Sequence, residues 1–329
     1  MDNIKRILLI RLSGIGDILF TLPAVNLVRE NFPNSEITFV TKKRFASLLQ
    51  GFTVLDKVIT LDSDIYHQQN IFRITKQTFD LIKTLHNQHF DLVVDFHGLE
   101  KTALIAWVTG SKQRWALLRK PNSRFFYTNY MEIPDTIHRA EANRKLLLNN
   151  HLQSFPPSNR YALPPGPQAE AETIFRQLGL NPAQPTIFIQ PFTNFPRKNW
   201  PLENYMRYAA YWNKQGLQIL FGGGPGDLGK LQSVIAANFP VTAGKANLLT
   251  TGGLMNLCSL VVGGDTGMLH LATALGKKVV MLMFRGQHQQ FHPYQHPEWR
   301  VIPANGDKIV DITVEAAIAM TESVLEGTP

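Results

Sequence analysis

Three glycine-rich segments follow predicted strands and precede predicted helices, where they could hold an anionic ligand. They read Leu-Ser-Gly-Ile-Gly-Asp at 12–17, Phe-Gly-Gly-Gly-Pro-Gly-Asp at 221–227 and Val-Gly-Gly-Asp-Thr-Gly-Met-Leu-His at 262–270. Glycine lets a ligand approach the backbone closely, and a helix N-terminus offers free N–H groups and a partial positive charge to an anion. The first segment has only two glycines of a G-x-G-x-x-G pattern, and the chain has no P-loop ending in Gly-Lys-Ser/Thr. Each segment is either a phosphate-binding turn or an ordinary tight turn of an α/β protein.

The third segment carries the densest set of reactive side chains. Asp265 and Thr266 stand where the N-cap of a helix is expected, and His270 follows Thr266 by about one helical turn. An N-cap accounts for one of the first two residues, but not for both of them together with the histidine. We therefore expect a carboxylate, a hydroxyl, free N–H groups and an imidazole to converge at this strand end.

A polar loop follows the predicted strand at 186–190 and reads Gln-Pro-Phe-Thr-Asn-Phe-Pro-Arg-Lys-Asn-Trp-Pro at 190–201. Loops at strand ends often carry functional side chains. Arg197 and Lys198 could hold phosphates, and Thr193 could donate a hydrogen bond to one. The alternative is that the two cations are ordinary surface charges before a helix.

Strands and helices alternate along the whole chain. In the first half, strands are predicted at 5–12, 36–41, 57–61 and 91–96, and helices from 18 onward, at 72–88 and ending at 143–150. Pro23 must lie in the first turn of its helix or mark a kink. In the second half, strands are predicted at 186–190, 218–221, 260–262 and 278–284, and helices at 169–178, 202–215, 228–237, 248–257, 267–275 and 314–325.

This alternation predicts an α/β chain with two Rossmann-like, doubly wound domains that face a cleft. Five prolines between 155 and 167 mark the linker. We expect a first domain at 1–155, a linker at 156–168 and a second domain at 169–329, with the last helix a candidate to pack back on the first domain.

The positive charge of the chain is concentrated in its first half. The whole chain has 33 basic and 25 acidic residues, and the segment 101–131 has six basic residues and no acidic one. Such a segment attracts phosphates, nucleic acid or an anionic membrane surface, although a solvated basic loop would look the same. Its aromatic residues could stack on bases, contact lipid head groups or pack in a core.

Two exclusions follow from composition. A single cysteine, Cys258, excludes an internal disulfide framework and a cysteine-based metal cluster. Apolar runs stay far below the ~20 residues that span a bilayer, and the first residues lack the layout of a secretory signal. We therefore expect a cytoplasmic protein.

Five segments together resemble glycosyltransferase family 9, which contains the lipopolysaccharide heptosyltransferases and has the GT-B fold. They occur in the order of the family: residues 10–17 with 21–24, then 91–99, 198–201, 223–227 and 264–272. The resemblance implies transfer of a sugar from a nucleotide-sugar to a hydroxyl, with inversion and without a metal ion or a cofactor.

The resemblance also implies roles for single residues. Asp17 matches the acidic residue proposed as the general base that activates the acceptor hydroxyl. The residues that match donor-binding positions are Thr193, Asn194, Lys198, Asp265, Thr266, Gly267 and His270. The residues that we expect near the acceptor are Ser13, Gly14, His97, Lys101, Arg119, Lys120 and Arg124.

The substrates implied are ADP-heptose and the inner core of lipopolysaccharide, either Kdo-lipid A or heptosyl-Kdo-lipid A. The enzyme would work as a peripheral protein on the anionic cytoplasmic face of the inner membrane, with no nucleic acid as partner. Asn194, Pro225 and His97 depart from the family's usual residues, and the first two bear on donor identity. Another nucleotide-sugar or acceptor is therefore the alternative.

Three other classes of function are compatible with parts of the sequence. A dinucleotide-dependent oxidoreductase is disfavoured, because the complete glycine fingerprint is missing after the first strand. A metal-dependent transferase could use Asp62 and Asp64, although such a pair more often solvates a strand end. A non-catalytic sugar- or nucleotide-binding protein fits the charge but leaves Asp17 without a role.

Overall fold

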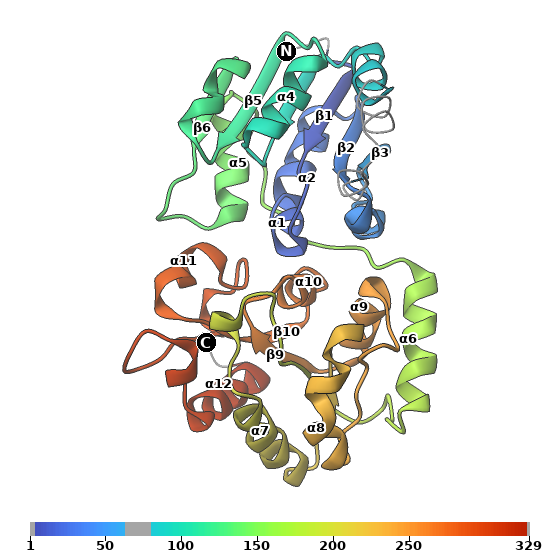
Figure 1. Cartoon of the computed structure of the whole chain (residues 1–329), viewed down its shortest axis with the longest axis vertical. Helices are drawn as coiled ribbons and strands as arrows, with labels where there is room; N and C mark the ends of the chain where they lie inside the picture. Colours follow the sequence, from blue (N-terminus) through green and yellow to red (C-terminus); the bar gives the residue numbers. More distant parts are fainter. Residues whose placement is uncertain (1–3, 63–79, 328–329) are drawn as a thin grey trace. The chain divides into compact units, whose positions relative to one another are not determined.

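The computed structural model describes residues 4–62 and 80–327, and the chain divides into two compact units, Met1–Asn159 and Arg160–Pro329 (Figure 1). The division falls inside the proline-rich stretch 156–168. The last residues of that stretch are not extended, because a helix, α6, begins at Pro165. Proline suits this position, since the first helical residue needs no hydrogen-bonded N–H.

The first unit contains a parallel sheet in the order β3-β2-β1-β4-β5-β6. Its strands are β1 (Arg6–Ile10), β2 (Glu36–Lys42), β3 (Lys57–Leu61), β4 (Leu92–Asp95), β5 (Gln113–Leu118) and β6 (Asn129–Glu132). The α-helices described in this unit are α1 (Ile15–Leu19), α2 (Leu22–Asn31), one at residues 80–87, α4 (Glu100–Val108) and α5 (Arg139–Asn149). The strand order reverses beside β1, and ligands of such sheets bind at the carboxyl ends of the strands at this point.

The helix predicted from residue 18 onward is two helices in the structure. α1 ends at Leu19, and α2 starts at Leu22 with Pro23 in its first turn. A proline there costs no internal hydrogen bond, whereas in mid-helix it would remove one. Pro23 is therefore in the first turn of a new helix, and the short α1 carries Asp17 on its own.

The basic segment 101–131 is ordered secondary structure, and the solvated-loop alternative is wrong for most of it. It forms α4, β5, the 3-10 helix η3 (Pro121–Phe126) and most of β6. The sequence does not predict α4, because its buried residues, Thr102, Ala103 and Ala106, are small and give a weak periodic signal. The predicted helix at 72–88 lies partly outside the described residues, and its described part is helical at 80–87.

The second unit contains a parallel sheet in the order β11-β10-β9-β7-β8. Its strands are β7 (Thr186–Gln190), β8 (Gln218–Phe221), β9 (Leu260–Gly264), β10 (Lys278–Leu282) and β11 (Arg300–Val301). Its longer helices are α6 (Pro165–Gln177), α7 (Leu202–Lys214), α9 (Leu248–Leu257), α10 (Gly267–Ala274) and α12 (Val314–Glu326). The helix predicted at 228–237 is instead the 3-10 helix η5 (Pro225–Leu231) followed by a short α8 (Gln232–Ala236), since Pro225 and two further glycines weaken its start.

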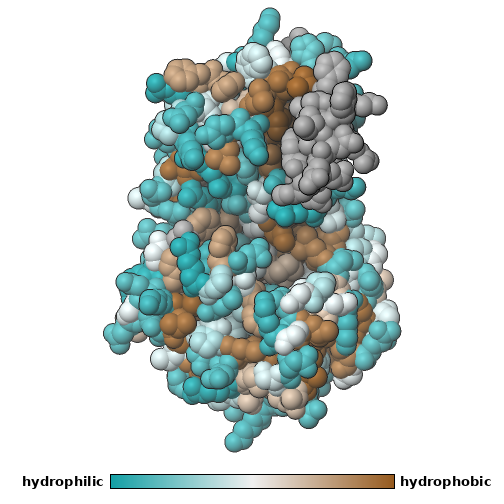
Figure 2. Space-filling model, in the orientation of Figure 1, coloured by the Kyte–Doolittle hydropathy of each residue, from teal (hydrophilic) through white to brown (hydrophobic). Residues whose placement is uncertain are grey.

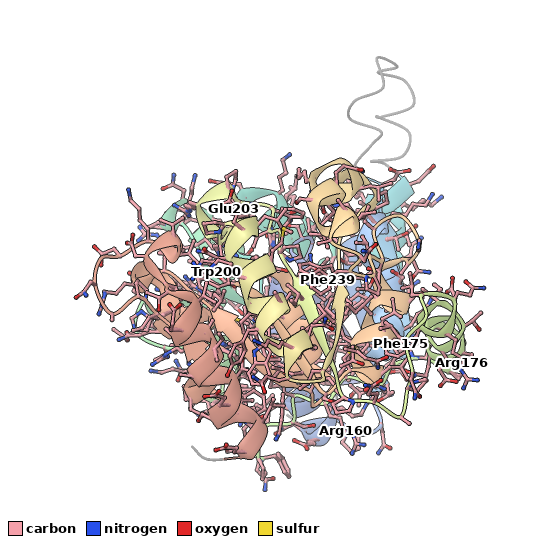
Figure 3. The ribbon with its side chains drawn as sticks, turned by 90° about the horizontal axis from the view of Figure 1, so that it is seen from below. Arg160, Phe175, Arg176, Trp200, Glu203 and Phe239 are labelled. Carbon is pink, nitrogen blue, oxygen red and sulfur yellow. The ribbon has the colours of Figure 1, made fainter. Side chains whose placement is uncertain are left out.

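The last helix, α12, packs against α7 and β10 of the second unit. The hydroxyls of Tyr208 and Thr321 are 2.6 Å apart, and the ammonium of Lys278 donates to the Leu325 carbonyl at 2.8 Å. Figure 3 shows α12 beside α7, with Trp200 near the start of α7, and the indole of Trp200 donates to the Ile312 carbonyl. The packing of α12 thus completes the core of the second unit.

Gly98 adopts a backbone conformation that only glycine enters readily, with φ +64°. A Cβ at this position would lie 2.0 Å from the Leu117 carbonyl oxygen, which belongs to β5. Gly110, in the same unit, has a similar φ of +72°, but its Cβ would meet only the ring edge of His86 at 3.2 Å. The two glycines share a left-handed backbone, but a Cβ would meet backbone atoms at Gly98 and only a side chain at Gly110. Gly110 is therefore the matched control for Gly98.

Gly98→Ala should lower the free energy of unfolding by at least about 2 kcal/mol, because left-handed strain is joined by a clash with backbone that cannot move away. Gly110→Ala should cost only the strain, about 1–2 kcal/mol. Urea unfolding followed by circular dichroism measures both. Equal losses in the two variants would contradict the packing described for Gly98.

Candidate active site

Asp17 lies in the first turn of α1, just after the carboxyl end of β1, with its side chain 30% exposed. The preceding turn brings the carboxylate back toward the chain at Gly14, whose φ is +88°. A Cβ at Gly14 would lie 2.5 Å from Oδ2 of Asp17. Glycine is therefore required both for the turn and for the space that the carboxylate occupies.

Two arginines pair with Asp17, and they differ in how firmly they are held. Arg11 has a side chain only 5% exposed; its Nη2 lies 2.6 Å from Oδ2 of Asp17, and its Nη1 donates to the Phe96 carbonyl at 2.6 Å. Arg119, which follows β5, has its Nη2 at 3.6 Å from the same oxygen, and its side chain is 38% exposed. Arg11 thus fixes the carboxylate, whereas Arg119 has room to contact a ligand.

These charges determine the protonation of the site. Burial opposes the ionisation of Asp17, but the positive charges of Arg11 and Arg119 outweigh it, so the pKa of Asp17 lies below its ordinary value. Burial, together with Arg11 and Arg119, lowers the pKa of His97 to about 3. At neutral pH the site therefore presents an ionised carboxylate beside a neutral imidazole.

A buried carboxylate shapes the turn that carries His97. Asp95, at the end of β4, accepts hydrogen bonds from the backbone N–H groups of His97 (2.7 Å) and Gly98 (3.1 Å) and from the hydroxyl of Tyr127 (2.6 Å). Burial raises the pKa of Asp95, and its hydrogen bonds only partly offset this effect. Asp95 is a positioning group, because every contact described for it is with the chain itself.

The structure separates the residues that were predicted to contact the acceptor. Gly14, His97 and Arg119 gather around Asp17, and the carbonyl of Ser13 accepts a hydrogen bond from Arg11 at 3.4 Å. The other three, Lys101, Lys120 and Arg124, are exposed on α4 and around η3. Arg124 lies over the ring of Phe125, 4.8 Å from its centroid.

Several residues of this site could not be assigned a role from the sequence. Arg11 makes the shorter of the two contacts with Asp17, and the signal for it is a cation placed directly after the apolar run 7–10, which is buried. Arg139 adds a positive charge that interacts with Asp17, and Lys42 one that interacts with His97. These cations are distant in sequence and come together only through the order of the strands.

A second cluster lies in the other unit, where β7 and β9 are neighbours. The ammonium of Lys198 lies 2.5 Å from Oδ2 of Asp265, and Nε2 of His270 lies 3.1 Å from Oδ1 of the same carboxylate. All three side chains are largely buried. Burial alone would raise the pKa of Asp265, but His270 and Lys198 lower it overall, so this carboxylate is ionised as well.

Close backbone approach explains why this cluster forms. A Cβ at Gly264 would lie 2.6 Å from the Lys198 carbonyl and 3.1 Å from Cγ2 of Thr193, so the loop after β7 rests on the end of β9. Thr266 is the N-cap of α10, since its hydroxyl accepts from the backbone N–H of Met268 at 3.0 Å. Capping by Thr266 leaves Asp265 available for Lys198 and His270.

The remaining predicted donor residues surround this cluster. Gly267 is the first residue of α10. The hydroxyl of Thr193 accepts from the backbone N–H of Phe195, and Asn194 is exposed beside it. Rings of Phe195 and Phe291 lie 5.8 and 5.5 Å from the Lys198 ammonium. A buried cation next to the N-terminus of an eight-residue helix is suited to bind a phosphate group.

The metal-site alternative rests on Asp62 and Asp64. No group of three or more histidine, cysteine or acidic side chains in the described part of the chain could hold a metal ion. Asp62 lies at the edge of the described residues, and Asp64 lies outside them.

No helix within 4–62 or 80–327 is long and apolar enough to cross a membrane.

Comparison with known proteins gives consistent matches. The model of glycosyltransferase family 9 (heptosyltransferase) matches residues 78–308. Lipopolysaccharide heptosyltransferase 1 of Escherichia coli K12 is 23% identical over 288 residues, covering 83% of this chain and 85% of that protein. The lipopolysaccharide core heptosyltransferase OpsX of Haemophilus influenzae is 21% identical over 322 residues, covering 95% of this chain and 86% of OpsX.

Solved structures match over nearly the full chain. A family 9 glycosyltransferase of Veillonella parvula has a TM-score of 0.86 at 22% identity and covers 99% of both chains. E. coli heptosyltransferase WaaC with ADP has a TM-score of 0.77 at 20% identity and covers 97% of this chain and 99% of that one. These matches confirm the predicted fold, GT-B with two Rossmann-like units.

Arg119→Gln should raise the pKa of Asp17, because it removes one of the positive charges that favour the ionised carboxylate. Lys120→Gln, the adjacent exposed cation, should leave that pKa unchanged. NMR titration of the Asp17 carboxyl carbon measures both without requiring activity. Equal titration curves for the two variants would show that Arg119 does not act on Asp17.

Proposed function

This chain belongs to glycosyltransferase family 9, and on that premise we propose that it transfers heptose from ADP-heptose to the inner core of lipopolysaccharide. The glycosyltransferase activity follows from the family. Heptose and the lipopolysaccharide core are supported by the names of the relatives, which are heptosyltransferases at 21–23% identity. The observation that carries the proposal is the ionised, partly exposed carboxylate of Asp17 in one unit, together with the phosphate-suited cluster around Lys198 in the other.

In the proposed reaction Asp17 removes the proton of the acceptor hydroxyl. The oxygen attacks the anomeric carbon of heptose, the bond from that carbon to the diphosphate breaks, and ADP leaves on the opposite side. The sugar configuration is thereby inverted. A positioned carboxylate provides general-base catalysis, which typically contributes 10²–10⁴-fold to the rate.

The acidity of Asp17 sets a condition on this role. A carboxylate held by two arginines is ionised but weakly basic. An anionic group of the acceptor that pairs with the exposed Arg119 would weaken one of these two contacts and make Asp17 more basic. An acceptor that carries carboxylates and phosphates fits this requirement, and it also fits the surplus of cations in the first unit.

The leaving group requires the second cluster. Negative charge grows on the diphosphate as the bond breaks, and preorganised positive groups stabilise it best. The ammonium of Lys198 and the N–H groups at the start of α10 supply such charge. We propose that they do so without a metal ion, while Asp265 and His270 hold Lys198 in place.

The lipid-linked acceptor implies that the enzyme works at the cytoplasmic face of the inner membrane. We propose peripheral association with the anionic leaflet, and no nucleic-acid partner. A donor panel tests the substrate assignment: ADP-heptose, other ADP-sugars, UDP-sugars and GDP-sugars are compared for transfer. Asn194 and Pro225 give the specific reason to include donors other than ADP-heptose, and faster turnover of another donor would replace heptose in the proposal.

Asp17→Asn should lower turnover by about 10²–10⁴-fold, because the amide cannot accept the proton. Affinity for ADP should stay within twofold, since Asp17 lies in the other unit from the donor cluster. Glu132→Gln, an exposed carboxylate of the same unit, is the matched control. Turnover of Asp17→Asn at the rate of the unaltered protein would exclude Asp17 as the base.

Lys198→Ala should weaken ADP binding by about ten- to a hundredfold, since charge-assisted hydrogen bonds to phosphate contribute roughly 1.5–3 kcal/mol. Titration calorimetry with ADP gives the affinity. Lys245→Ala removes an exposed cation of the same unit and should bind ADP normally. Unchanged affinity in Lys198→Ala would remove Lys198 from the diphosphate site.

Treatment with EDTA should leave the transfer rate unchanged, because Lys198 and the α10 N-terminus stand where a divalent cation would otherwise neutralise the diphosphate. The rate is measured with and without chelator. If EDTA abolished activity and Mg²⁺ or Mn²⁺ restored it, the proposal of a metal-independent reaction would be wrong, and Asp62 and Asp64 would be the candidate metal ligands.

A further inference from the structure

The first unit exposes large apolar side chains on α4 and η3. Leu104 and Trp107 of α4 are 50% and 56% exposed, and Phe125 of η3 is 79% exposed. Leu104 and Trp107 are three residues apart and therefore neighbours on the helix surface, and Lys101 and Glu100 precede Leu104 by three and four residues. We call the α4–η3 surface the set formed by these residues and the nearby cations: Lys101, Leu104, Trp107, Lys120, Arg124 and Phe125.

Packing holds the two parts of this surface together. The rings of Trp107 and Phe126 meet edge to face with centroids 6.5 Å apart, and α4 packs against η3. The next residue, Tyr127, is anchored by its hydrogen bond to Asp95. The exposed ring of Phe125 is therefore carried by a well-ordered segment and has the guanidinium of Arg124 against its face.

Charge distinguishes the kind of partner that this surface fits. Its three cations lie in the segment 101–131, which has no acidic residue; the acids next to it in sequence are Glu100, exposed in the first turn of α4, and Glu132 of β6. Aromatic rings flanked by lysine and arginine are favourable at a bilayer interface, where rings enter the headgroup region and cations meet lipid phosphates. Figure 2 shows brown apolar residues at the surface among teal hydrophilic ones on this unit. A protein partner would need matching acidic groups, whereas an anionic membrane supplies them over its whole surface.

We propose that the α4–η3 surface docks the enzyme on an anionic lipid bilayer, with Trp107 and Phe125 in the headgroup region and Lys101, Lys120 and Arg124 on lipid phosphates. This inference deepens the proposed function, which needs a lipid-linked acceptor, but it concerns a surface different from the Asp17 site. Arg119, the neighbour of Lys120, belongs to the Asp17 site and is not part of the docking surface.

Tryptophan fluorescence provides a direct probe of this contact. Of the five tryptophans, Trp115, Trp200 and Trp212 are buried, Trp299 is half-buried and stacked on His296, and Trp107 alone is more than half exposed. The full chain is mixed with vesicles of phosphatidylglycerol and phosphatidylethanolamine that contain no saccharide acceptor. Lipids brominated near the headgroup should quench the fluorescence, and Trp107→Phe should lose most of this quenching while still binding the vesicles.

Affinity for the vesicles is then measured by sedimentation. Phe125→Ala should weaken it about tenfold or more, because the exposed ring would no longer be buried in lipid. Each of Lys120→Gln and Arg124→Gln should weaken it about fivefold, and high salt should release the protein. The matched controls are Val310→Ala, which is 49% exposed on the second unit, and Lys245→Gln, and neither should change the affinity.

Failure of this inference can be told apart from failure of the proposed function. Phe125→Ala should transfer sugar to a detergent-dispersed acceptor at the normal rate, because the residue does not belong to the Asp17 site. Absence of vesicle binding, or equal binding by Phe125→Ala and Val310→Ala, would overturn the docking surface and leave transfer untouched. Vesicle binding by a chain that transfers no heptose would support the surface and overturn the proposed function.

Discussion

Parallel pairing of neighbouring strands determines where the charged side chains of this protein meet. Ile10 stands opposite Asp95 in the pair β1–β4, and Gln190 stands opposite Gly263 in the pair β7–β9. Because the strands run in one direction, the residues that follow them emerge at the same edge of the sheet. Arg11 therefore reaches the carbonyl of Phe96, which is 85 positions away in sequence. In the second unit, the same constraint brings the loop after β7 onto the end of β9.

The two units use a similar solution for a buried carboxylate, with different consequences. Asp17 and Asp265 are both kept ionised by neighbouring positive or hydrogen-bonding groups that outweigh burial. Asp17 keeps a solvent-exposed edge, because Arg11 covers one side of the carboxylate and Nη2 of Arg119 lies 3.6 Å from its Oδ2. Asp265 is closed in by Lys198 and His270 and is only 6% exposed. The first carboxylate can meet a ligand proton, whereas the second is suited to orient a cation.

Local signals sufficed for the parts of the molecule that depend on short stretches of chain. The strands β3, β7 and β8 and the helix α9 have the predicted bounds, and the residues that end each of them are close neighbours in sequence. The helix α4 was missed because its buried side chains are too small to give a strong periodic signal. The role of Arg11 depends on a contact with the end of a distant strand, and the different surroundings of Arg119 and Lys120 depend on the bend that follows β5. Counting charges along 101–131 could not distinguish these two neighbours.

The position of α12 has a consequence for the order in which the polypeptide acquires its structure during translation. The ribosome completes the first unit at about residue 159, while the face of α7 and β10 that receives α12 must wait until residues beyond 314 have emerged. At roughly 5–20 residues per second, this interval lasts about 10–30 seconds. During that time the nascent chain carries a complete first unit and an incomplete second unit, whose apolar face that will contact α12 is open to aggregation.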